Sequence, residues 1–272
     1  MQLPIDLRNK LESLISYLNS KKIIVAFSGG VDSSLLAYLS KKYAKETLLL
    51  TINSDLNPSG ENEEAKRFAK KHKISHREIM INLLENKEFV NNPKERCYIC
   101  KKEIFSNMIE IKQSENYDLI IDGSNIDDKD DFRPGMKALT ELNVDSPYIL
   151  FDINKQDIRE LSRYFNLETY SKPSSACLAS RIPYAQKITK EKLQMISKAE
   201  EFLKKQFNLT QLRVRYHEGR LARIELLSNE LPKILNQKNL IKIKNKLKEL
   251  GFVYITLDVE GFRSGSLNEI FS

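Results

Sequence analysis

The chain of 272 residues has few cysteines and no long apolar run. Its three cysteines are an odd number, which argues against a disulfide framework. No apolar stretch is long enough to span a bilayer, and the first residues lack the basic-then-apolar pattern of a secretory signal. We therefore expect a cytoplasmic protein with no membrane partner.

The commonest nucleotide-binding signatures are also missing. Without Gly-x-x-x-x-Gly-Lys-Ser/Thr an ordinary Walker loop is excluded, and without Gly-x-Gly-x-x-Gly a dinucleotide site is disfavoured. The sequence contains no internal repeat and no low-complexity tail. The net charge of +7 is modest for this length and fits a soluble lysine-rich surface, a phosphorylated substrate or RNA. No RNA-binding signature accompanies it, so the charge alone does not decide between them.

What the chain does contain is a strand, a glycine turn and a helix start within residues 22–40. The continuous apolar run 23–27 predicts a strand that is buried on both faces, as in a parallel sheet. Ser28-Gly29-Gly30 interrupts the run, and apolar residues then recur at helical spacing over 31–40. Small side chains and free N–H groups at such a helix start can wrap an anion, most often a phosphate.

Strands and helices alternate along the following residues. Buried strands are predicted at 46–52, 75–81, 119–121 and 148–151, so that with the first strand the sheet has five strands. This alternation predicts an α/β fold with a doubly wound parallel sheet. Beyond a loop at 171–184 the pattern changes to helix, hairpin, helix and strand. We therefore expect an α/β domain over residues 1–185 and a small α+β domain over residues 186–272.

Polar residues follow two of the predicted strands. Ser54 comes after the second strand and Asp122-Gly123-Ser124-Asn125 after the fourth. Ligands of open α/β sheets bind at the carboxyl ends of the strands, so Ser54 is a candidate nucleotide contact. Part of the acidic run 127–131 is a candidate to face the nucleotide or its magnesium, although such a run is usually a solvated loop.

The cysteines lie in two segments, Cys97-Tyr98-Ile99-Cys100 and a loop containing Cys177. With no second C-x-x-C and no histidine pair, a structural zinc site is poorly supported, and a thioredoxin-like pair would need a different setting. Both segments are predicted as loops at the carboxyl edge of the sheet, which would bring three thiols near the glycine turn. Three thiolates can hold a four-iron cluster on three corners, leaving one iron to carry a sulfide. The alternative is three unrelated thiols buried as small hydrophobes.

Several motifs carry a family resemblance. Ser28-Gly29-Gly30-Val31-Asp32-Ser33 resembles the pyrophosphate loop of the ATP pyrophosphatase superfamily, whose members cut ATP between the α and β phosphates and adenylate a substrate oxygen. Longer motifs are similar to the LarE family of pyridinium-3,5-biscarboxylate mononucleotide sulfur transferases, which help to build the nickel-pincer nucleotide cofactor of lactate racemase. These motifs lie at residues 92–101, 122–128, 132–135, 172–183, 213–215, 222–225 and 261–268.

The resemblance implies a reaction in two stages. ATP adenylates a carboxylate of the pyridinium mononucleotide and pyrophosphate leaves, after which sulfur displaces AMP to give a thiocarboxylate. Many members take the sulfur from one cysteine, which corresponds to Cys177 here, and are spent after one turnover. A second branch has three cysteines and a [4Fe-4S] cluster. This sequence resembles the second branch, with Cys97, Cys100 and Cys177 as the expected ligands and catalytic sulfur groups.

The resemblance also assigns ATP contacts. The expected phosphate-binding residues are Ser28, Gly29, Gly30, Asp32, Ser33 and Ser34, and the expected adenosine-binding residues are Ala26, Phe27, Ser54 and Gly123. Mg²⁺ would offset the charge of the leaving pyrophosphate. Lys101 is expected to stabilise the acyl-adenylate, the alternative being a plain surface lysine.

The expected substrate contacts lie further along the chain. Arg213 and Arg215 alternate along a strand, which fits either a clamp on the substrate's phosphate or a solvated basic face. Ser180 and Arg181 are expected to complete the phosphate or carboxylate contacts, and Glu225 to face a subunit interface. Family members are homo-oligomers, often hexamers, so we expect a multimer.

Three other functions remain open. Related ATP pyrophosphatases with three cysteines and a cluster thiolate tRNA, which the positive charge would suit. Amidation with glutamine or ammonia, as in nucleotide synthetases with the same loop, would leave the cysteines without a role. A non-enzymatic nucleotide-binding module is the third. The origin of the transferred sulfide is not indicated by the sequence.

Overall fold

The computed structural model describes residues 3–128, 134–173, 175–263, 265–267 and 269. The chain divides into two compact units, each of which is described by itself. The first unit comprises residues 1–54, 60–81 and 95–174, and the second comprises residues 55–59, 82–94 and 175–272. Within the described part of the chain, no helix combines the length and the apolar character that crossing a membrane requires.

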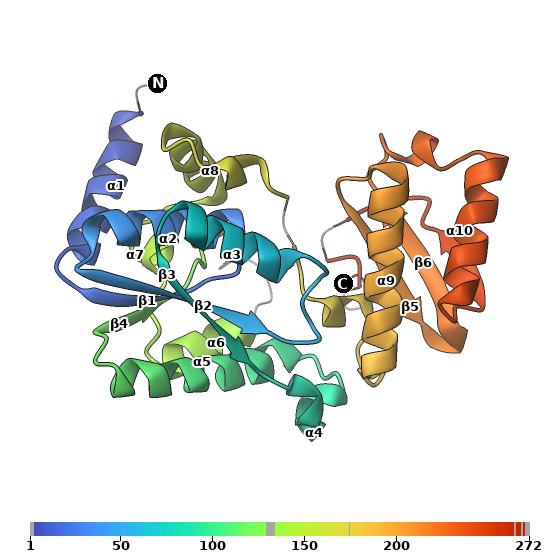
Figure 1. Cartoon of the computed structure of the whole chain (residues 1–272), viewed down its shortest axis with the longest axis horizontal. Helices are drawn as coiled ribbons and strands as arrows, with labels where there is room; N and C mark the ends of the chain where they lie inside the picture. The colour runs from blue at the N-terminus through green and yellow to red at the C-terminus, as the bar shows by residue number, and fades with distance from the viewer. Residues whose placement is uncertain (1–2, 129–133, 174, 264, 268, 270–272) are drawn as a thin grey trace. The chain divides into compact units, whose positions relative to one another are not determined.

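The first unit is a parallel sheet with helices on both faces. Its strands, in the spatial order β3-β2-β1-β4, are β1 (Lys22–Ala26), β2 (Glu46–Asn53), β3 (Ser75–Met80) and β4 (Leu119–Ile121). Its helices are α1 (Ile5–Leu18), α2 (Val31–Tyr43), α3 (Glu61–Lys71), α5 (Arg96–Ser114), α6 (Pro134–Glu141), α7 (Pro147–Leu150) and α8 (Lys155–Tyr164). Helices α5 and α6 lie on one face, and α1, α2 and α8 lie on the other (Figure 1). The predicted doubly wound α/β class is confirmed.

Alternation along β1 explains why the sheet has two covered faces. Ile23 and Val25 are fully buried in the apolar core that contains the leucines of α1 and α2. Ile24, between them, is buried in a second core with Phe105 and Met108 of α5. A strand that is covered on both faces needs apolar residues at every position, which accounts for the continuous run in the sequence.

The fifth strand predicted at 148–151 is wrong, because these residues form helix α7. Pro147 occupies the first turn of α7, where its missing N–H and fixed φ are tolerated. The chain makes only a single parallel bridge beside β4, between Ile121 and Asp145, before it turns into the helix. Four apolar residues are too few for periodicity to distinguish a strand from a short buried helix. The sheet formed by the described residues therefore has four strands.

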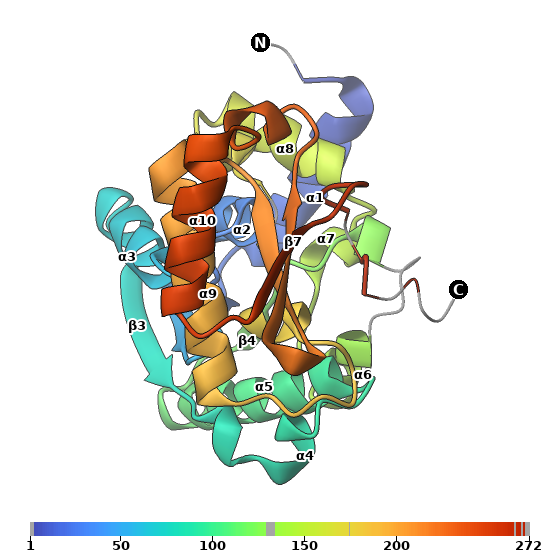
Figure 2. The same ribbon diagram turned by 90° about the vertical axis from the view of Figure 1, so that its right-hand side faces the viewer.

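The second unit is a small α+β arrangement. Its strands β5 (Leu212–His217) and β6 (Leu221–Leu226) form an antiparallel pair, and β7 (Tyr254–Leu257) pairs with β6 in parallel. Its helices are α4 (Lys87–Val90), α9 (Lys190–Phe207) and α10 (Gln237–Glu249). Figure 2 shows α9 and α10 on the same face of this sheet. The buried residues Leu193, Ile196 and Leu203 form an apolar stripe along α9.

The loop around residues 175–185 groups with the second unit, so the compact units differ from the predicted domains 1–185 and 186–272. The reason is a set of contacts within that unit. The Asn92 side-chain amide donates to the carbonyls of Ile182 and Pro183 at 3.2 and 2.7 Å. The Leu178 amide donates to the Leu56 carbonyl at 2.8 Å. The functional division between the two predicted domains stays a prediction.

Candidate functional site

The glycine turn after β1 is closed by its own hydroxyl groups. Gly29 has φ +69°, a left-handed conformation that glycine adopts without strain. The Ser33 hydroxyl accepts from the Ser28 amide and donates to the Gly30 carbonyl, each at 3.3 Å. Gly30 is extended and α2 begins at Val31. The turn therefore presents small side chains at the start of a helix, the arrangement that suits a phosphate.

The strand side of the turn is fixed by a chain of hydrogen bonds from β2 and β3. The Thr51 hydroxyl donates to the Phe27 carbonyl at 2.8 Å, so it must accept the bond from His76 Nε2 at 2.9 Å. Burial lowers the pKa of His76, which favours the neutral ring. The Phe27 side chain is buried against Phe68, with ring centroids 5.4 Å apart. Any contact of Phe27 with an adenosine would therefore use its backbone.

Residues after β4 approach the same turn. A Cβ added to Gly123 would lie 3.1 Å from the Ser33 amide nitrogen and from the Asp32 Cβ, so only glycine fits there without displacement. The neighbouring Asp122 carboxylate is buried and accepts hydrogen bonds from the Ser124 and Ser146 hydroxyls, both at 2.6 Å. Lys101 Nζ lies 3.3 Å from the same carboxylate. Gly123 therefore lies against the phosphate turn. Lys101 is held near the turn by its contact with Asp122, the residue before Gly123.

Two lysines that the sequence did not single out contact the turn. Lys155, the first residue of α8, forms an ion pair with Asp32, and its Nζ lies 2.6 Å from Asp32 Oδ1. Lys172 donates to the Gly29 carbonyl at 2.9 Å and pairs with Glu64 at 2.6 Å. The only signal in the sequence was indirect: a phosphate loop without a lysine of its own needs cations from elsewhere.

The remaining predicted nucleotide contacts lie at the carboxyl edge of the sheet. Ala26 is the last residue of β1, and Ser54 directly follows β2. In the acidic run, the Asp127 carboxylate accepts from the Lys155 amide at 2.9 Å, which places it beside the turn. Lys129, Asp130 and Asp131, like Phe132 and Arg133 of a predicted motif, lie outside the described residues.

The C-x-x-C lies in a helix, which corrects the predicted loop. Helix α5 begins at Arg96, so Cys97 and Cys100 occupy its first turns at i and i+3 and share one side of it. Cys97 is exposed and Cys100 is half-buried. Pro93 ends the preceding helical turn, after which nothing in the sequence opposes an early helix start. In the part of the chain that is described, no three His, Cys, Asp or Glu side chains are placed to hold a metal ion.

Cys177 is exposed and belongs to the second unit, at the start of the turn η4 (Leu178–Arg181). Its carbonyl accepts from the Ser180 hydroxyl at 2.8 Å and from Arg181 Nη1 at 3.2 Å. Arg181 is buried and makes a bidentate pair with Glu200, at 2.9 and 3.1 Å. Ser180 and Arg181 therefore hold the backbone of Cys177. The predicted meeting of all three thiols stays a prediction.

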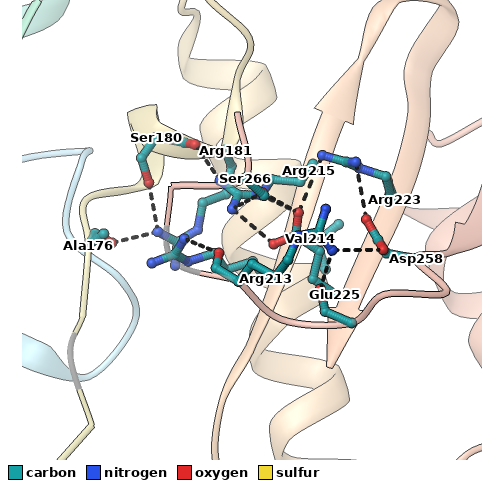
Figure 3. Close-up of polar contacts among 12 residues, drawn as sticks. Ala176, Ser180, Arg181, Arg213, Val214, Arg215, Arg223, Glu225, Asp258 and Ser266 are labelled. Atoms are coloured by element: carbon teal, nitrogen blue, oxygen red, sulfur yellow. Dashed lines mark hydrogen bonds and ion pairs between the residues drawn. The ribbon is translucent and has the colours of Figure 1, made fainter. Parts of the chain in front are cut away.

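Arg215 is committed to internal partners. It is 2% exposed and makes a bidentate pair with Glu225, with both N–O distances at 2.9 Å. It also donates to the Ser180 carbonyl at 2.7 Å and to the Ser266 hydroxyl at 2.8 Å (Figure 3). The interpretation of Glu225 as an interface residue is wrong, because its side chain is fully buried within this unit.

Arg213 differs from its strand neighbour. It is buried, its guanidinium lies 4.7 Å from the centroid of the Phe262 ring, and Nη1 donates a long bond of 3.4 Å to the Arg263 carbonyl. No carboxylate of the described residues forms an ion pair with it. Burial, followed by the neighbouring Arg215 and Arg181, lowers the pKa of Arg213 to about 10. A buried cation that lacks an anion is a candidate binding group for one.

Comparisons with known proteins give one match to the first part of the chain and others to nearly all of it. A family model described as "Family of unknown function (DUF7411)" matches residues 21–176. An uncharacterised protein of Synechocystis is 35% identical over 269 residues, which cover 98% of this chain and 99% of that protein. The family match contains the phosphate turn and all four strands of the first unit's sheet.

Two relatives have names that describe an activity. The pyridinium-3,5-bisthiocarboxylic acid mononucleotide synthase of Lactiplantibacillus plantarum is 29% identical over 97% of this chain and 95% of its own length. A tRNA-specific 2-thiouridylase of Fusobacterium nucleatum is 27% identical over 57% of this chain and 54% of its own length. The first of these matches confirms the resemblance predicted from the sequence motifs.

Proposed function

The chain belongs to the family of unknown function DUF7411, and we propose that it is an ATP-dependent sulfur transferase. Its proposed substrate is pyridinium-3,5-biscarboxylic acid mononucleotide, whose carboxylates it converts to thiocarboxylates for a nickel-pincer nucleotide cofactor. The observation that carries the proposal is the turn 28–34, which combines small side chains, backbone amides and a helix start in the arrangement that suits a phosphate.

In the first step a substrate carboxylate oxygen attacks the α-phosphorus of ATP, and pyrophosphate leaves. The amides and hydroxyls of residues 28–34 hold the β and γ phosphates, and Gly123 leaves room for the nucleotide beside Ser33. Lys101, held 3.3 Å from the buried Asp122 carboxylate, offsets charge on the acyl-adenylate. Mg²⁺, when bound with ATP, would supply Lewis-acid stabilisation of the leaving pyrophosphate.

In the second step a sulfur nucleophile attacks the acyl carbon, and AMP leaves with the original carboxylate oxygen. Cys177 is the proposed donor, because its side chain is exposed while Ser180 and Arg181 fix its backbone. If the sulfur atom comes from Cys177 itself, loss of the Cα proton to solvent and cleavage of the Cβ–Sγ bond form a Cα=Cβ double bond, which leaves dehydroalanine at position 177, and the protein is spent.

Repeated turnover needs a renewable sulfur source. We assign Cys97, Cys100 and Cys177 as ligands of a [4Fe-4S] cluster, which when bound would supply an exchangeable sulfide. Two of the thiols share the first turns of α5, a spacing at which both can face one ligand. The third thiol, Cys177, belongs to the second unit. Its assignment as a ligand together with Cys97 and Cys100 rests on the family resemblance.

The mononucleotide phosphate is assigned to Arg213. Arg213 is buried and has no carboxylate partner in the described part of the chain, which leaves it available to an anion, whereas Arg215 and Arg181 are each paired with a bidentate carboxylate. These two arginines act by shaping the loop of Cys177 and the strand that presents Arg213. A homo-oligomer, as in the resembling family, remains part of the proposal.

The adenylation step is tested by pyrophosphate release. The purified protein is incubated with Mg²⁺ and ATP, with and without the pyridinium mononucleotide, and pyrophosphate is measured. We expect release that depends on the mononucleotide and persists in Cys177→Ser, because the thiol acts after adenylation. Release that is equal without the mononucleotide, or absent in both conditions, contradicts the proposal.

The sulfur source is tested by anaerobic purification with iron and sulfide analysis. The cluster assignment predicts four iron atoms per chain and their loss when Cys97, Cys100 or Cys177 is replaced singly by serine. If the protein binds no iron and Cys177 loses its sulfur during one turnover, the sacrificial route is correct instead. The mass of the intact protein after reaction distinguishes the two routes.

Thiolation of tRNA is the second candidate, because the thiouridylase relative matches more than half of this chain. It predicts tight, salt-sensitive binding of bulk tRNA, since neutralised phosphates release counterions. The first proposal predicts weak binding of tRNA and mononucleotide-dependent pyrophosphate release. Measuring tRNA affinity at two salt concentrations separates the two functions.

A further inference from the structure

Lys155 stands out among the groups that contact the phosphate turn, because it lies far from the turn in sequence and has no role in the steps above. Its Nζ lies 2.6 Å from Asp32 Oδ1, across 123 residues of chain. Asp32 is the sole charged residue in the turn 28–34. The pair thus couples the first residue of α8 to the single charge within the phosphate-binding segment.

The Lys155 backbone is fixed independently of its side chain. Its amide donates to the Asp127 carboxylate at 2.9 Å, and the preceding Asn154 forms a capping box with Asp157. The Tyr148 hydroxyl donates to the Asp32 carbonyl at 2.9 Å and fixes the other end of the pair. Because both backbones are anchored, the ammonium group can change partner by side-chain rotation alone.

Charge balance determines which partner it would choose when nucleotide binds. The triphosphate of ATP carries several negative charges, and Asp32 adds another beside them. An ordinary Walker loop contributes its own lysine, and this turn has none. Lys172 is bonded to the Gly29 carbonyl and to Glu64, which fixes it on the backbone of the turn. Among the described residues, Lys155 Nζ contacts only Asp32, whose carboxylate Mg²⁺ is chemically suited to take over.

We propose that Lys155 is a nucleotide-phosphate ligand that exchanges partners: it pairs with Asp32 in the free protein and with the β and γ phosphates when Mg·ATP binds. The Asp32 carboxylate is released by the exchange and is then available to Mg²⁺. This inference rests on the proposed function, since it assumes that the turn binds ATP. By this exchange Lys155 supplies the phosphate turn with the lysine that residues 28–34 lack.

Calorimetric titration of Mg·ATP, Mg·pyrophosphate and AMP into the wild type, Lys155→Met and Lys155→Arg tests the exchange. We expect Lys155→Met to weaken Mg·ATP and Mg·pyrophosphate by about 10- to 100-fold, as the loss of a charge-assisted hydrogen bond implies. AMP lacks the two phosphates concerned, so its affinity should change by less than about twofold. Lys155→Arg should retain part of the affinity because it keeps the charge.

Lys10→Met is the matched control. Lys10 pairs with Asp157 of the same helix α8 at 3.4 Å, and the two side chains are 20% and 18% exposed, against 30% and 24% for Lys155 and Asp32. If removing an ion pair merely loosens α8, Lys10→Met will weaken Mg·ATP equally, and the inference is overturned.

Two further results would overturn the exchange while leaving the proposed function intact. These are an unchanged Mg·ATP affinity in Lys155→Met, and an equal weakening of AMP and Mg·ATP. If the wild type itself binds no Mg·ATP, the proposed function fails together with the inference, so the two failures are distinguishable.

Discussion

Replacing Arg213 by methionine should stabilise the protein, although Arg213 is buried. The side chain is 7% exposed, and its cation has no carboxylate partner among the described residues. Arg215 is the matched comparison, because it is two residues away on β5, is also buried, at 2% exposed, and is paired with Glu225. The two substitutions remove the same charge from one strand and differ only in the partners left behind.

The magnitude follows from the shift in pKa. A folded-state pKa of about 10, well below the usual value for arginine, means that burial and neighbouring cations destabilise the charged form by about 3 kcal/mol. Methionine removes this penalty and loses the contact with the Phe262 ring, which is worth about 1 kcal/mol. We expect Arg213→Met to raise the free energy of unfolding by about 1–2 kcal/mol. Arg215→Met leaves Glu225 without its bidentate partner and should lower it by about 3–5 kcal/mol.

Urea unfolding measured by circular dichroism gives both values. The folded-state pKa of Arg213 lies below the unfolded-state pKa, so the penalty is complete below about pH 10 and declines as the pH rises from that value toward the unfolded-state pKa. The difference between Arg213→Met and the wild type should therefore be the same at neutral pH and at about pH 9. If Arg213→Met destabilises the protein as much as Arg215→Met, the guanidinium has an anionic partner and the reasoning is refuted.

Adding a ligand to the unfolding experiment connects the stability of these variants to function. Nicotinic acid mononucleotide carries a pyridinium ring and a phosphate and is a simple probe of the assigned site. It should raise the wild-type free energy of unfolding in proportion to the logarithm of its concentration. It should not stabilise Arg213→Met. Equal stabilisation of both proteins would show that Arg213 does not contact the phosphate.

Three smaller changes test the turn and a strained loop. Thr51→Val removes the hydroxyl that accepts from His76, and urea unfolding should show that the free energy of unfolding falls by about 1–3 kcal/mol. An unchanged free energy of unfolding would mean that water replaces the hydroxyl. Gly123→Ala brings a methyl group within 3.1 Å of the Ser33 amide, and calorimetry should show weakened Mg·ATP binding while circular dichroism shows an intact fold. Ala185 has φ +64°, so Ala185→Gly should raise the free energy of unfolding by roughly 0.5–1 kcal/mol, and the melting midpoint should rise with it. An unchanged midpoint would mean that the strain is relieved elsewhere.

The elements with strong periodicity or long apolar runs could be predicted from the sequence. The helix expected after the 171–184 loop is α9, Lys190–Phe207, which an N-cap threonine and an apolar stripe define. Residues 148–151 were predicted as a strand because they are apolar, but the preceding proline and the single bridge at Asp145 start a helix. Short apolar segments are decided by tertiary contacts that no local pattern contains.

The phosphate turn could be predicted for a similar reason, since its strand, glycines and capping residues are contiguous. The partners of Arg215 and Arg181 could not, because Glu225 and Glu200 come from a neighbouring strand and from α9. Strand alternation correctly placed Arg213 and Arg215 on one side and gave no indication that only one of them is neutralised. Lys155 was missed because its ion pair depends on where α8 begins relative to the turn.

The most direct test of the proposed reaction follows a labelled oxygen. The pyridinium mononucleotide is prepared with heavy-isotope oxygen in its carboxylates and incubated with Mg²⁺, ATP and the protein, and the nucleotide products are analysed by mass spectrometry. The account predicts one labelled oxygen in each AMP, because the carboxylate oxygen attacks the α-phosphorus and leaves with AMP when sulfur replaces it. Label in orthophosphate, or unlabelled AMP formed together with thiocarboxylate, would contradict it.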